Sequence, residues 1–348
     1  MALSKLKRQT IVDSLLSEIG RDEYFRGFSI KDFAKTHGLS PQSVYRYLSI
    51  LESENKVTKK REGKRNRYQL VDSAYYFVFP VTGISEDVVW NQSIKPLLAD
   101  LPEIAFKNCN YAFTEMLNNA IDHSEGTHID ISISINAFRV SILIADNGVG
   151  IFTKIADAMK FEEKRFAVLE LAKGKFTTAP DSHTGEGIFF SAKAVDLFTI
   201  LSDDLIFTSS SFEEKESELL FDYRERISGG TIVSFDIFRD HSTTVSELFD
   251  RYTNEPDHYG FSKTRVPVKL LEFGDPDPIF VSRSQAKRLL VRFERFEKIE
   301  LDFNGIDEIG QGFADEVFRV FQKQHPDSEI VAVNCSPKVE RMIRRVTS

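Results

Sequence analysis

Residues 145–151 read ADNGVGI and place a carboxylate and two glycines at the end of a predicted strand. The Asp146 side chain can accept a hydrogen bond from an exocyclic amine, and Gly148 and Gly150 let the backbone approach a flat ring closely. The pattern therefore favours contact with a planar, amine-bearing ligand. A glycine-rich turn after a strand is also common without a ligand, so a purely structural turn is the alternative.

A second pair of glycines, in the stretch HTGEGIFFSAKAVD, comes directly before a predicted helix. Gly185 and Gly187 would expose backbone amides at the N-terminus of that helix, an arrangement that favours phosphate. An ordinary helix-entry turn would have the same sequence pattern. Later in the chain, SGGTIVSF brings Thr231 into another strand.

The stretch TEMLNNAIDHSEG, residues 114–126, predicts a helix with an uncommon polar face. Asparagine is a mediocre helix former because its side chain competes for backbone hydrogen bonds, yet Asn118 and Asn119 are adjacent here. By helical spacing, Glu115, Asn119 and Asp122 share one face. The apolar stripe on another face consists of Phe113, Met116, Leu117, Ala120 and Ile121. The helix alone leaves open whether its polar face meets only water.

A predicted β-hairpin positions the first of these motifs, because HIDISISINAFRVSILIADNG alternates between apolar and polar residues. Its buried face consists of Ile129, Ile131, Ile133, Ile135, Val140, Ile142 and Ile144. The turn falls near Asn136, and the second strand runs directly into Asp146. We therefore expect a hairpin with one buried face that delivers Asp146 to the edge of a core.

Length and composition indicate a multidomain protein, since 348 residues suggest two or three domains and 41% hydrophobic residues are ample for packed cores. No apolar run reaches membrane-spanning length, and the N-terminal MALSKLKRQT lacks the apolar stretch of a signal peptide. Cys109 and Cys335 form no metal-type pair, and the seven histidines show no ligand spacing. We expect a cytoplasmic protein with no membrane contact and no structural zinc.

Charge is distributed unevenly along the chain. Residues 1–70 contain 15 Lys and Arg against 8 Asp and Glu, a net charge of +7, whereas the remainder carries 30 against 45 and is net −15. A basic head on an acidic body suggests that only the head meets a polyanion.

The basic head, residues 1–70, predicts three helices followed by a hairpin. Ser40 is a suitable N-cap and Pro41 a suitable first residue for the third helix, while Glu62-Gly63 fits the hairpin turn. This order resembles a winged helix-turn-helix domain, whose third helix enters the DNA major groove. The resemblance implies contacts with duplex DNA by Gln42, Ser43, Arg46, Lys59, Lys60, Arg61, Lys64, Arg65 and Arg67. A wing that binds protein instead of DNA is the alternative.

The region from about 91 to 240 resembles the GHKL superfamily of gyrase, Hsp90-type chaperones, histidine kinases and mismatch-repair ATPases. EMLNNAIDH is similar to the N box of that family, DNGVG to its G1 box and TGEG to its G2 box, in the family's order. The resemblance implies a Bergerat-type α/β sandwich that binds ATP and Mg²⁺, with KGKFTTAPDSHTGEG as the ATP lid. No pair of helices with a phosphoacceptor histidine precedes the region, so an ordinary sensor kinase is not expected.

The GHKL resemblance also implies roles for single residues. Asn119 occupies the position that carries Mg²⁺ through its amide oxygen, and Glu115 the position of the base that orients water in hydrolysing members. Asp122 and His123 would approach Mg²⁺ or the lid. The other cofactor-binding positions that it implies are Asp146, Gly148, Gly150, Lys175, Thr184, Gly185, Gly187 and Thr231.

Within that set, Asp146 would contact the adenine amino group, with Thr231 supporting it through water. Lys173 and Lys175 could reach the phosphates or simply face solvent. Glu186 departs from the family pattern, because the G2 box usually has a neutral residue there, beside the expected phosphates. This carboxylate opposes tight ATP binding unless it points away.

Residues 265–348 alternate predicted strands and helices, which indicates a small α/β module. Strands are expected in PIFVS, IELDF and EIVAVN, and helices at 283–294, 310–324 and 337–346. The module resembles STAS-like domains, which pair with GHKL serine kinases and are phosphorylated on a serine or threonine before the second helix. The corresponding loop, NGIDEIGQGFADE, contains neither residue.

A missing acceptor favours docking of this module over a phosphorylation relay. The docking partner would be the chain's own ATPase domain near the lid, or a separate protein. In the first case, acidic side chains of the module would face Lys173 and Lys175, and Ile309 and Phe313 would supply apolar contact. The acidic side chains are Asp307, Glu308, Asp315 and Glu316. A purely structural or dimerising domain is the alternative.

The sequence thus predicts an α+β multidomain chain with a winged helix at 1–70, a connector at 71–90, a GHKL domain at 91–240 and a STAS-like module at 265–348. The leading hypothesis is an ATP-controlled DNA-binding regulator with slow ATP hydrolysis. A serine/threonine kinase of anti-sigma type that acts on a separate partner is one alternative, and a module of a bacterial stress or antiviral system is another. Each of these three hypotheses is compatible with a homodimer.

Overall fold

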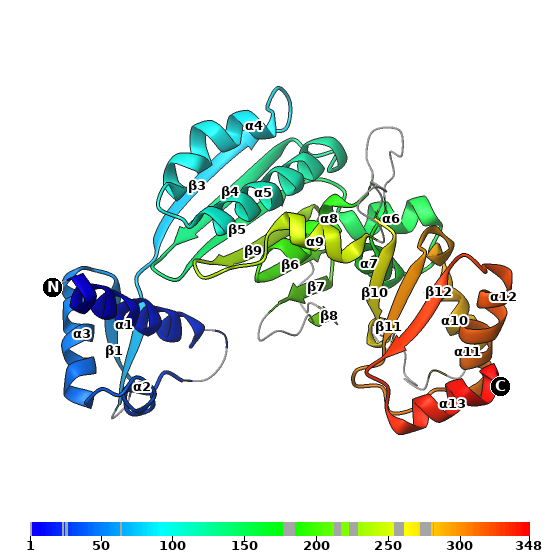
Figure 1. Ribbon diagram of the computed structural model, residues 1–348. Coiled ribbons are helices and arrows are strands. Elements are labelled where there is room, and N and C mark those ends of the chain that lie inside the picture. Colours follow the sequence, from blue (N-terminus) through cyan, green and yellow to red (C-terminus); the bar gives the residue numbers. More distant parts are fainter. Residues whose placement is uncertain are drawn as a thin grey trace.

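The computed structural model describes residues 2–22, 24, 27–62, 65–176, 185–211, 217–222, 229–253, 261–271, 280 and 282–348. Within these residues the chain forms three parts in sequence order. Figure 1 shows the N-terminal part in blue, the central part in cyan to yellow, and the C-terminal part in dark yellow to red. The two outer parts lie at opposite ends of the central part (Figure 1). No helix in the described ranges is both long and apolar enough to cross a bilayer.

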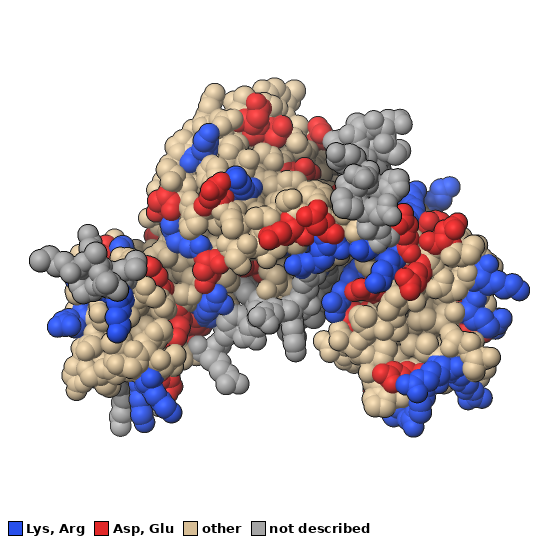
Figure 2. Space-filling view, viewed as in Figure 1, with Lys and Arg blue, Asp and Glu red and all other residues tan. Residues whose placement is uncertain are grey.

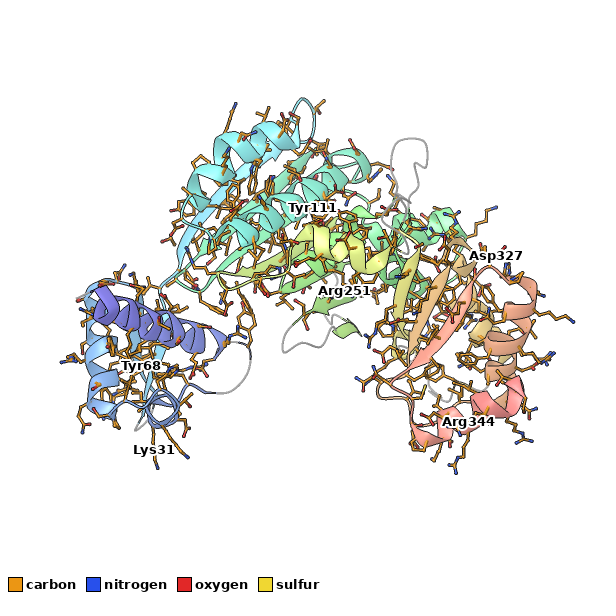
Figure 3. All side chains as sticks on the ribbon, in the orientation of Figure 1. Lys31, Tyr68, Tyr111, Arg251, Asp327 and Arg344 are labelled. Carbon is orange, nitrogen blue, oxygen red and sulfur yellow. The ribbon has the colours of Figure 1, made fainter. Side chains whose placement is uncertain are left out.

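The N-terminal part consists of three helices and a two-stranded antiparallel hairpin. Its elements are α1 (Ala2–Arg21), α2 (Ile30–Thr36), α3 (Pro41–Ser53), β1 (Val57–Glu62) and β2 (Arg65–Leu70). The predicted start of α3 is observed, because the Ser40 hydroxyl accepts a hydrogen bond from the Ser43 amide and Pro41 is the first helical residue. Tyr68 of β2 is buried in the core of this part (Figure 3). Gly63, the expected turn residue, lies outside the described residues.

The central part is built on a seven-stranded antiparallel sheet with the strand order β3-β4-β5-β9-β6-β7-β8. The strands are β3 (Ser73–Pro80), β4 (His128–Ile135), β5 (Arg139–Asp146), β6 (Leu197–Ser202), β7 (Leu205–Ser210), β8 (Ser217–Asp222) and β9 (Thr231–Phe238). The predicted hairpin is observed as β4 and β5, in which Ile133 is opposite Ile142 and Asn136 lies in the turn. Its isoleucines are buried as the alternation predicts, except Ile135, which is half-buried.

Helices cover one face of the central sheet, with α5 and α8 in contact with each other and with its strands (Figure 1). The helices are α4 (Glu86–Val89), α5 (Glu103–His123), α6 (Ile151–Met159), α7 (Arg165–Lys173), α8 (Gly187–Ala194) and α9 (Val245–Tyr252), with a π-helical turn (Trp90–Ile94) and a 3-10 turn (Lys95–Leu98) after α4. The apolar stripe of α5 faces the sheet, since Phe113, Met116, Leu117 and Ala120 are all buried. This packing orients the polar face of α5 toward one end of the sheet.

Within residues 71–90, predicted to be a connector, Ser73–Pro80 form strand β3 of the central sheet. Strand β3 pairs with β4 along its whole length, from Ser73 opposite Ile135 to Pro80 opposite His128. Phe77 and Phe79 pack against the central core. The aromatic cluster YYFVF is therefore an edge strand whose alternate side chains cover the core, and its partner strand lies too far along the chain for local periodicity to indicate the pairing.

The C-terminal part is a three-stranded parallel sheet with helices. Its elements are β10 (Lys263–Pro267), a 3-10 turn (Val268–Leu271), α10 (Arg283–Leu290), a 3-10 turn (Phe293–Arg295), β11 (Lys298–Asp302), α11 (Gln311–Asp315), a π-helical segment (Glu316–Phe321), α12 (Gln322–Gln324), β12 (Glu329–Val333) and α13 (Pro337–Thr347). The strand predicted in PIFVS is wrong as far as it is described, because Phe280 makes only an isolated bridge to Ile309. The sheet begins instead with β10, whose charged sequence KTRVP did not suggest a buried strand.

Two hydrophobic cores hold these parts together. The larger core is continuous between the central and C-terminal parts and includes both Phe261 and Phe293. The smaller core belongs to the N-terminal part, but Phe138 and Phe238 of the central part are buried in it. Both outer parts are therefore packed against the central part through apolar contacts.

Basic side chains also gather on the C-terminal part, around α13 (Figure 2). Arg341, Arg344 and Arg345 are exposed there, and only Arg344 of the three forms a described ion pair, with Glu340. Residues 71–348 are net acidic on average, but α13 carries a local excess of basic side chains. The expectation that only the head meets a polyanion stays a prediction.

Candidate functional site

A cavity of about 300 Å³ lies between the polar face of α5, the start of α6, the end of α7 and the ends of β5 and β9. Eight of the predicted site residues line it: Glu115, Asn119, His123, Asp146, Gly150, Gly185, Gly187 and Thr231. Asp122 does not line the cavity and is exposed to solvent. Gly148 and Lys175 do not line it either, and Thr184 lies outside the described residues. The three sequence motifs therefore converge on one cavity.

Asp146 lies at the end of β5 and is fixed by backbone amides. Its Oδ1 accepts hydrogen bonds from the Gly148 amide at 2.9 Å and the Thr231 amide at 3.3 Å. Burial raises the pKa of this carboxyl group, and these hydrogen bonds partly oppose that shift. A partly buried carboxylate in a fixed orientation is suited to accept a hydrogen bond from a ligand amine.

The glycines around Asp146 permit close backbone packing. A Cβ on Gly148 would lie 1.9 Å from the Ser124 carbonyl oxygen, so the fold requires a glycine at this position. Gly150 has φ +85° and lines the cavity. Gly150 therefore lies where the backbone could face a ligand, whereas Gly148 does not line the cavity, and the approach of either glycine to a flat ring stays a prediction.

Thr231, at the start of β9, links the end of β5 and the start of α6 beside the cavity. Its Oγ1 accepts a hydrogen bond from the Ile151 amide at 2.9 Å, while its own amide donates to Asp146. The first turn of α6 and the start of β9 are therefore held beside the same carboxylate.

The polar face of α5 supplies Glu115, Asn119 and His123 to the cavity. The Asn119 amide nitrogen is buried and lacks a hydrogen-bond partner among the described atoms. A Cβ on Gly187 would lie 2.0 Å from Glu115 Oε2, so the glycine at the start of α8 makes room for this carboxylate. An unpartnered buried amide in a ligand-sized cavity needs a polar ligand, because leaving such a group unpaired is costly.

The residues around Asn119 fit a Mg²⁺ ion that is held mainly by a nucleotide. No group of three His, Cys, Asp or Glu side chains within the described ranges could hold a metal on its own. Mg²⁺ commonly takes one or two protein oxygen atoms and completes its shell with water and substrate phosphates. The Asn119 side-chain oxygen would be the protein ligand of such an ion, while its unpartnered Nδ2 can only donate a hydrogen bond, for example to a phosphate oxygen.

Lys173 and Lys175, for which contact with phosphates and exposure to solvent were both left open, do not line the cavity and instead contact the C-terminal part. Lys173 is 1% exposed and pairs with Glu170, with 2.5 Å between Nζ and Oε1. The Lys175 Nζ donates to the Arg295 carbonyl in the C-terminal part at 3.1 Å. Glu186 is partly buried, and burial raises the pKa of its carboxyl group while Lys175 lowers it.

The acidic side chains expected to face these lysines are engaged elsewhere. Asp307 and Glu308 pair with Lys338, and Asp315 pairs with Arg283 and Arg319. Glu316 is buried. The side chains expected to supply apolar docking contact, Ile309 and Phe313, are likewise buried beside Phe280 inside the C-terminal part. The C-terminal part does contact the central part near the predicted lid, but through other residues.

The predicted DNA-contacting residues lie on α3 and the hairpin. Gln42 and Arg46 are exposed on α3, whereas Ser43 is half-buried and its hydroxyl lies 3.0 Å from that of Ser40. Lys59, Lys60 and Arg61 are exposed on β1. Arg67 lies 3.5 Å from the buried Asp22 carboxylate and belongs to a structural contact. Lys64 and the Arg65 side chain lie outside the described residues.

Some residues that line the cavity were not predicted as site residues. Leu171 lines it from α7 and Lys154 from α6, while Phe176 lines it from the start of the predicted lid. The Lys154 Nζ donates to the His123 carbonyl at 2.7 Å and pairs with Glu125 at 2.9 Å. On the head, sequence analysis overlooked Tyr45, which is 49% exposed beside Arg46 and could have been found from its position on the polar face of the predicted helix.

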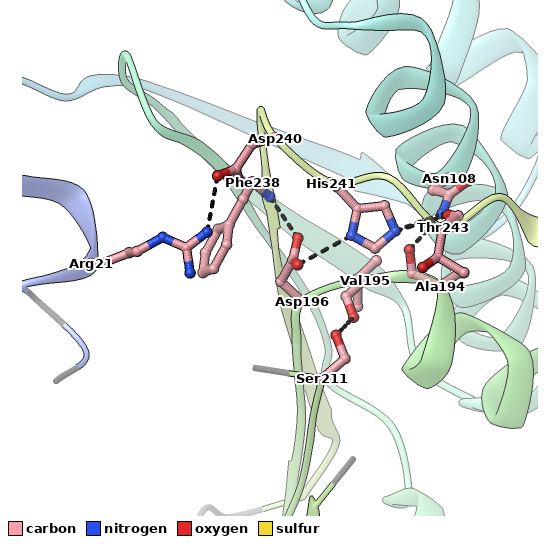
Figure 4. A network of polar contacts seen from close by, with 10 residues as sticks. All are labelled: Arg21, Asn108, Ala194, Val195, Asp196, Ser211, Phe238, Asp240, His241 and Thr243. Atoms are coloured by element: carbon pink, nitrogen blue, oxygen red, sulfur yellow. Dashed lines mark hydrogen bonds and ion pairs between the residues drawn. The ribbon is translucent and has the colours of Figure 1, made fainter. Parts of the chain in front are cut away.

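A buried polar network lies at the other end of β9 (Figure 4). The Asn108 Nδ2 is 2.8 Å from both the Ala194 and the Thr243 carbonyl oxygens, and these take its two hydrogens. The His241 Nε2, 3.0 Å from the Thr243 oxygen, must then carry its own proton, while Nδ1 lies 3.1 Å from Asp196 Oδ1. Burial opposes protonation of His241, but the hydrogen bond and charge of Asp196 outweigh it and raise the pKa.

Comparisons with known proteins agree with the central and C-terminal parts of this architecture. Residues 108–240 match the family described as histidine kinase-, DNA gyrase B- and HSP90-like ATPase. Residues 285–340 match the STAS-like domain of unknown function (DUF4325). No curated protein matches the chain. The chain is thus a multidomain α+β protein with a GHKL-type ATPase domain and a C-terminal STAS-like domain.

Proposed function

We propose that this chain binds Mg²⁺-ATP in the cavity and uses nucleotide occupancy to control how its N-terminal part contacts duplex DNA. ATP binding is supported by the GHKL family match together with the convergence of Glu115, Asn119, Asp146 and Thr231 on one cavity. In this proposal Asp146 and Thr231 hold the adenine, and the backbone around Gly185 and Gly187 faces the phosphates at the start of α8. When bound, Mg²⁺ would be held by Asn119 and would neutralise phosphate charge.

The proposed control is supported by the position of β5 and β9, which run from the cavity to the core of the N-terminal part. At one end of these paired strands, Asp146 and Thr231 line the cavity. At the other end, Phe138 and Phe238 are buried in the core of the N-terminal part, with their ring centres 4.3 Å apart. Each strand spans about 26 Å at about 3.3 Å per residue. Two rigid elements therefore connect the nucleotide cavity to the head.

The head is fixed to these strands by polar as well as apolar contacts. Arg21 at the end of α1 pairs with Asp240 at 2.9 Å. The Tyr24 hydroxyl donates to Asp236 on β9 at 2.5 Å. A Cβ on Gly20 would lie 2.3 Å from the Phe138 ring, so α1 packs directly against the end of the hairpin. Small shifts of β5 or β9 would be transmitted to α1, because packed interfaces do not deform continuously.

The DNA-contacting function is supported by the arrangement of the head. Three helices followed by a basic hairpin have the element order of a winged helix-turn-helix domain, and the exposed side chains Gln42, Arg46, Lys59, Lys60 and Arg61 supply polar and cationic groups. In this proposal α3 enters the major groove and the hairpin contacts phosphates.

Glu115 is the residue proposed to act on the bound nucleotide. Its carboxylate lies at the start of α8, beside Gly187, where it could orient water or another hydroxyl group. Slow hydrolysis would return the chain to its nucleotide-free form. A protein hydroxyl in place of water would make the chain a serine/threonine kinase, and labelled phosphate recovered on protein instead of as free phosphate would establish that activity.

The test is to measure binding of a labelled random-sequence duplex by fluorescence anisotropy, with and without saturating Mg²⁺-ATP. We expect the dissociation constant for DNA to change by about fivefold or more, a typical coupling between sites. In the Asp146→Asn variant, tested at the same ATP concentration, the change should shrink. Equal DNA affinity with and without ATP, at an ATP concentration shown by calorimetry to saturate the cavity, would contradict the proposal.

A further inference from the structure

Arg292 lies in the turn after α10, where the C-terminal part contacts the central part. Its Nη1 is 3.1 Å from Glu170 Oε2, and its Nη2 donates to the Lys175 carbonyl. Its guanidinium carbon also lies 5.2 Å from the centre of the Phe176 ring. One side chain of the STAS-like domain therefore contacts both α7 and the segment that follows it.

Further polar contacts reinforce this junction from both sides. The Lys173 Nζ donates to the Val291 carbonyl at 2.8 Å, and the Thr264 hydroxyl donates to the Lys173 carbonyl at 2.8 Å. The side chains of Lys173 and Glu170 are each 1% exposed. Buried charges are tolerated only when they are paired and hydrogen-bonded, so this arrangement depends on the C-terminal part remaining docked.

The backbone at the junction adopts an uncommon conformation on both sides. Lys175 has φ +54° and Arg292 has φ +64°, and the two residues are joined by the bond from the Arg292 guanidinium to the Lys175 carbonyl. Non-glycine residues hold this left-handed conformation only where the surrounding structure enforces it, and such positions cluster at functional sites. The segment 174–176 is therefore held in place by its contacts with the C-terminal part.

The same segment is part of the wall of the nucleotide cavity. Leu171 and Phe176 both line the cavity, whereas Arg292 does not. A Cβ on Gly185 would lie 2.4 Å from the Phe176 carbonyl carbon, so the glycine before α8 packs directly on the Phe176 backbone. Moving Phe176 would therefore disturb both the side of the cavity and the proposed phosphate-facing backbone.

We propose that Arg292 is a positioning residue of the nucleotide site, supplied by the STAS-like domain, and that domain docking and nucleotide binding strengthen each other. This inference rests on the proposed ATP binding. ATP requires Leu171 and Phe176 in place, and Arg292 holds them there through Glu170 and Lys175. By linkage, bound ATP stabilises the docked domain by the same factor. A protein partner that draws the domain away from residues 170–176 would lower ATP affinity.

Two variants of the full chain, Arg292→Ala and Arg292→Lys, test the inference by calorimetric titration with Mg²⁺-ATP. Lysine keeps the charge but cannot donate in a fork to Glu170 and to the Lys175 carbonyl at once. Both variants should bind ATP about fivefold or more weakly, with alanine the weaker of the two. Arg283→Ala is the matched control. It removes the same charge from the same part of the chain, but Arg283 pairs with Asp315 inside that part. The control should bind ATP as the wild type does.

Hydrogen exchange separates positioning from general destabilisation. In the wild type, ATP should slow amide exchange in residues 289–296, although these residues do not line the cavity. In Arg292→Lys, ATP should still slow exchange around Asp146 but should no longer affect residues 289–296. If the wild type does not bind ATP, the proposed function itself fails. If ATP binds but leaves exchange in residues 289–296 unchanged, or if both Arg292 variants bind ATP with wild-type affinity, the role of Arg292 is refuted.

Discussion

Replacing Asp146 with asparagine should weaken nucleotide binding while preserving the fold. The Oδ1 atom of Asp146 accepts hydrogen bonds from the amides of Gly148 and Thr231. An asparagine side-chain oxygen can accept both bonds, so the turn and the start of β9 are retained. The asparagine amide nitrogen then replaces the other carboxylate oxygen and presents a donor to the adenine amine, which is itself a donor.

The size of the loss in ATP affinity follows from the mispaired donor. A buried polar group without its partner costs about 1–3 kcal/mol. Because about 1.4 kcal/mol corresponds to a factor of ten, ATP should bind about 5- to 150-fold more weakly. Burial also raises the pKa of Asp146. The wild-type affinity should therefore fall as pH decreases through that raised pKa, where the acceptor becomes protonated, and the affinity of Asp146→Asn should not follow this change.

Calorimetric titration of Mg²⁺-ATP at several pH values measures both effects. Asp130→Asn is a suitable control, because Asp130 lies on β4, accepts a hydrogen bond from Tyr76, and does not line the cavity. Equal melting temperatures of the wild type and both variants would show that the fold is intact. An Asp146→Asn protein that is folded and binds ATP as tightly as the wild type would refute the assignment of this cavity.

Three further predictions address turnover, DNA contact and pH. Glu115→Ala should keep ATP affinity and lose about 10²–10⁴-fold in phosphate release, and an unchanged rate would exclude it as the base. The logarithm of DNA affinity should fall linearly with the logarithm of salt concentration, and salt-independent binding would argue for a protein-binding wing. Arg46→Ala should blunt sequence preference, whereas Lys60→Ala should weaken binding to all duplexes alike. Because the pKa of His241 is raised in the folded state, its contribution to the free energy of unfolding is complete below its ordinary value of about 6.5 and is lost as pH rises through the folded value. His241→Gln should remove that part of the pH dependence in denaturant titrations, and a variant curve parallel to the wild type would contradict it.

The elements that sequence analysis predicted well depend on local rules. The alternation of Ile129 to Ile144 requires one buried sheet face, and the Ser40-Pro41 pair begins a helix whatever surrounds it. The helical face of Glu115 and Asn119 follows from spacing within one element. Residues whose positions are set by nearby backbone could therefore be placed before the fold was known.

The elements that were missed depend on contacts between distant segments. Strand β3 is recognisable only from its pairing with β4. Lys173 has the sequence context of a solvated lysine, and its burial depends on contact with Val291, directly after α10. Gly148 appears in the G1 motif as a ligand contact, although the Ser124 carbonyl already occupies the space beside it. Arg292 has no motif at all, because its role arises from a turn in one domain meeting the end of a helix in another.

The central claim is that nucleotide occupancy of the cavity and DNA contact by the head are coupled through β5 and β9. Its most direct test is the calorimetric affinity for Mg²⁺-ATP in the presence and absence of a saturating duplex. Reciprocity of linked binding requires DNA to change ATP affinity by the same factor by which ATP changes DNA affinity, about fivefold or more. An ATP affinity that is the same with and without bound DNA would contradict the account.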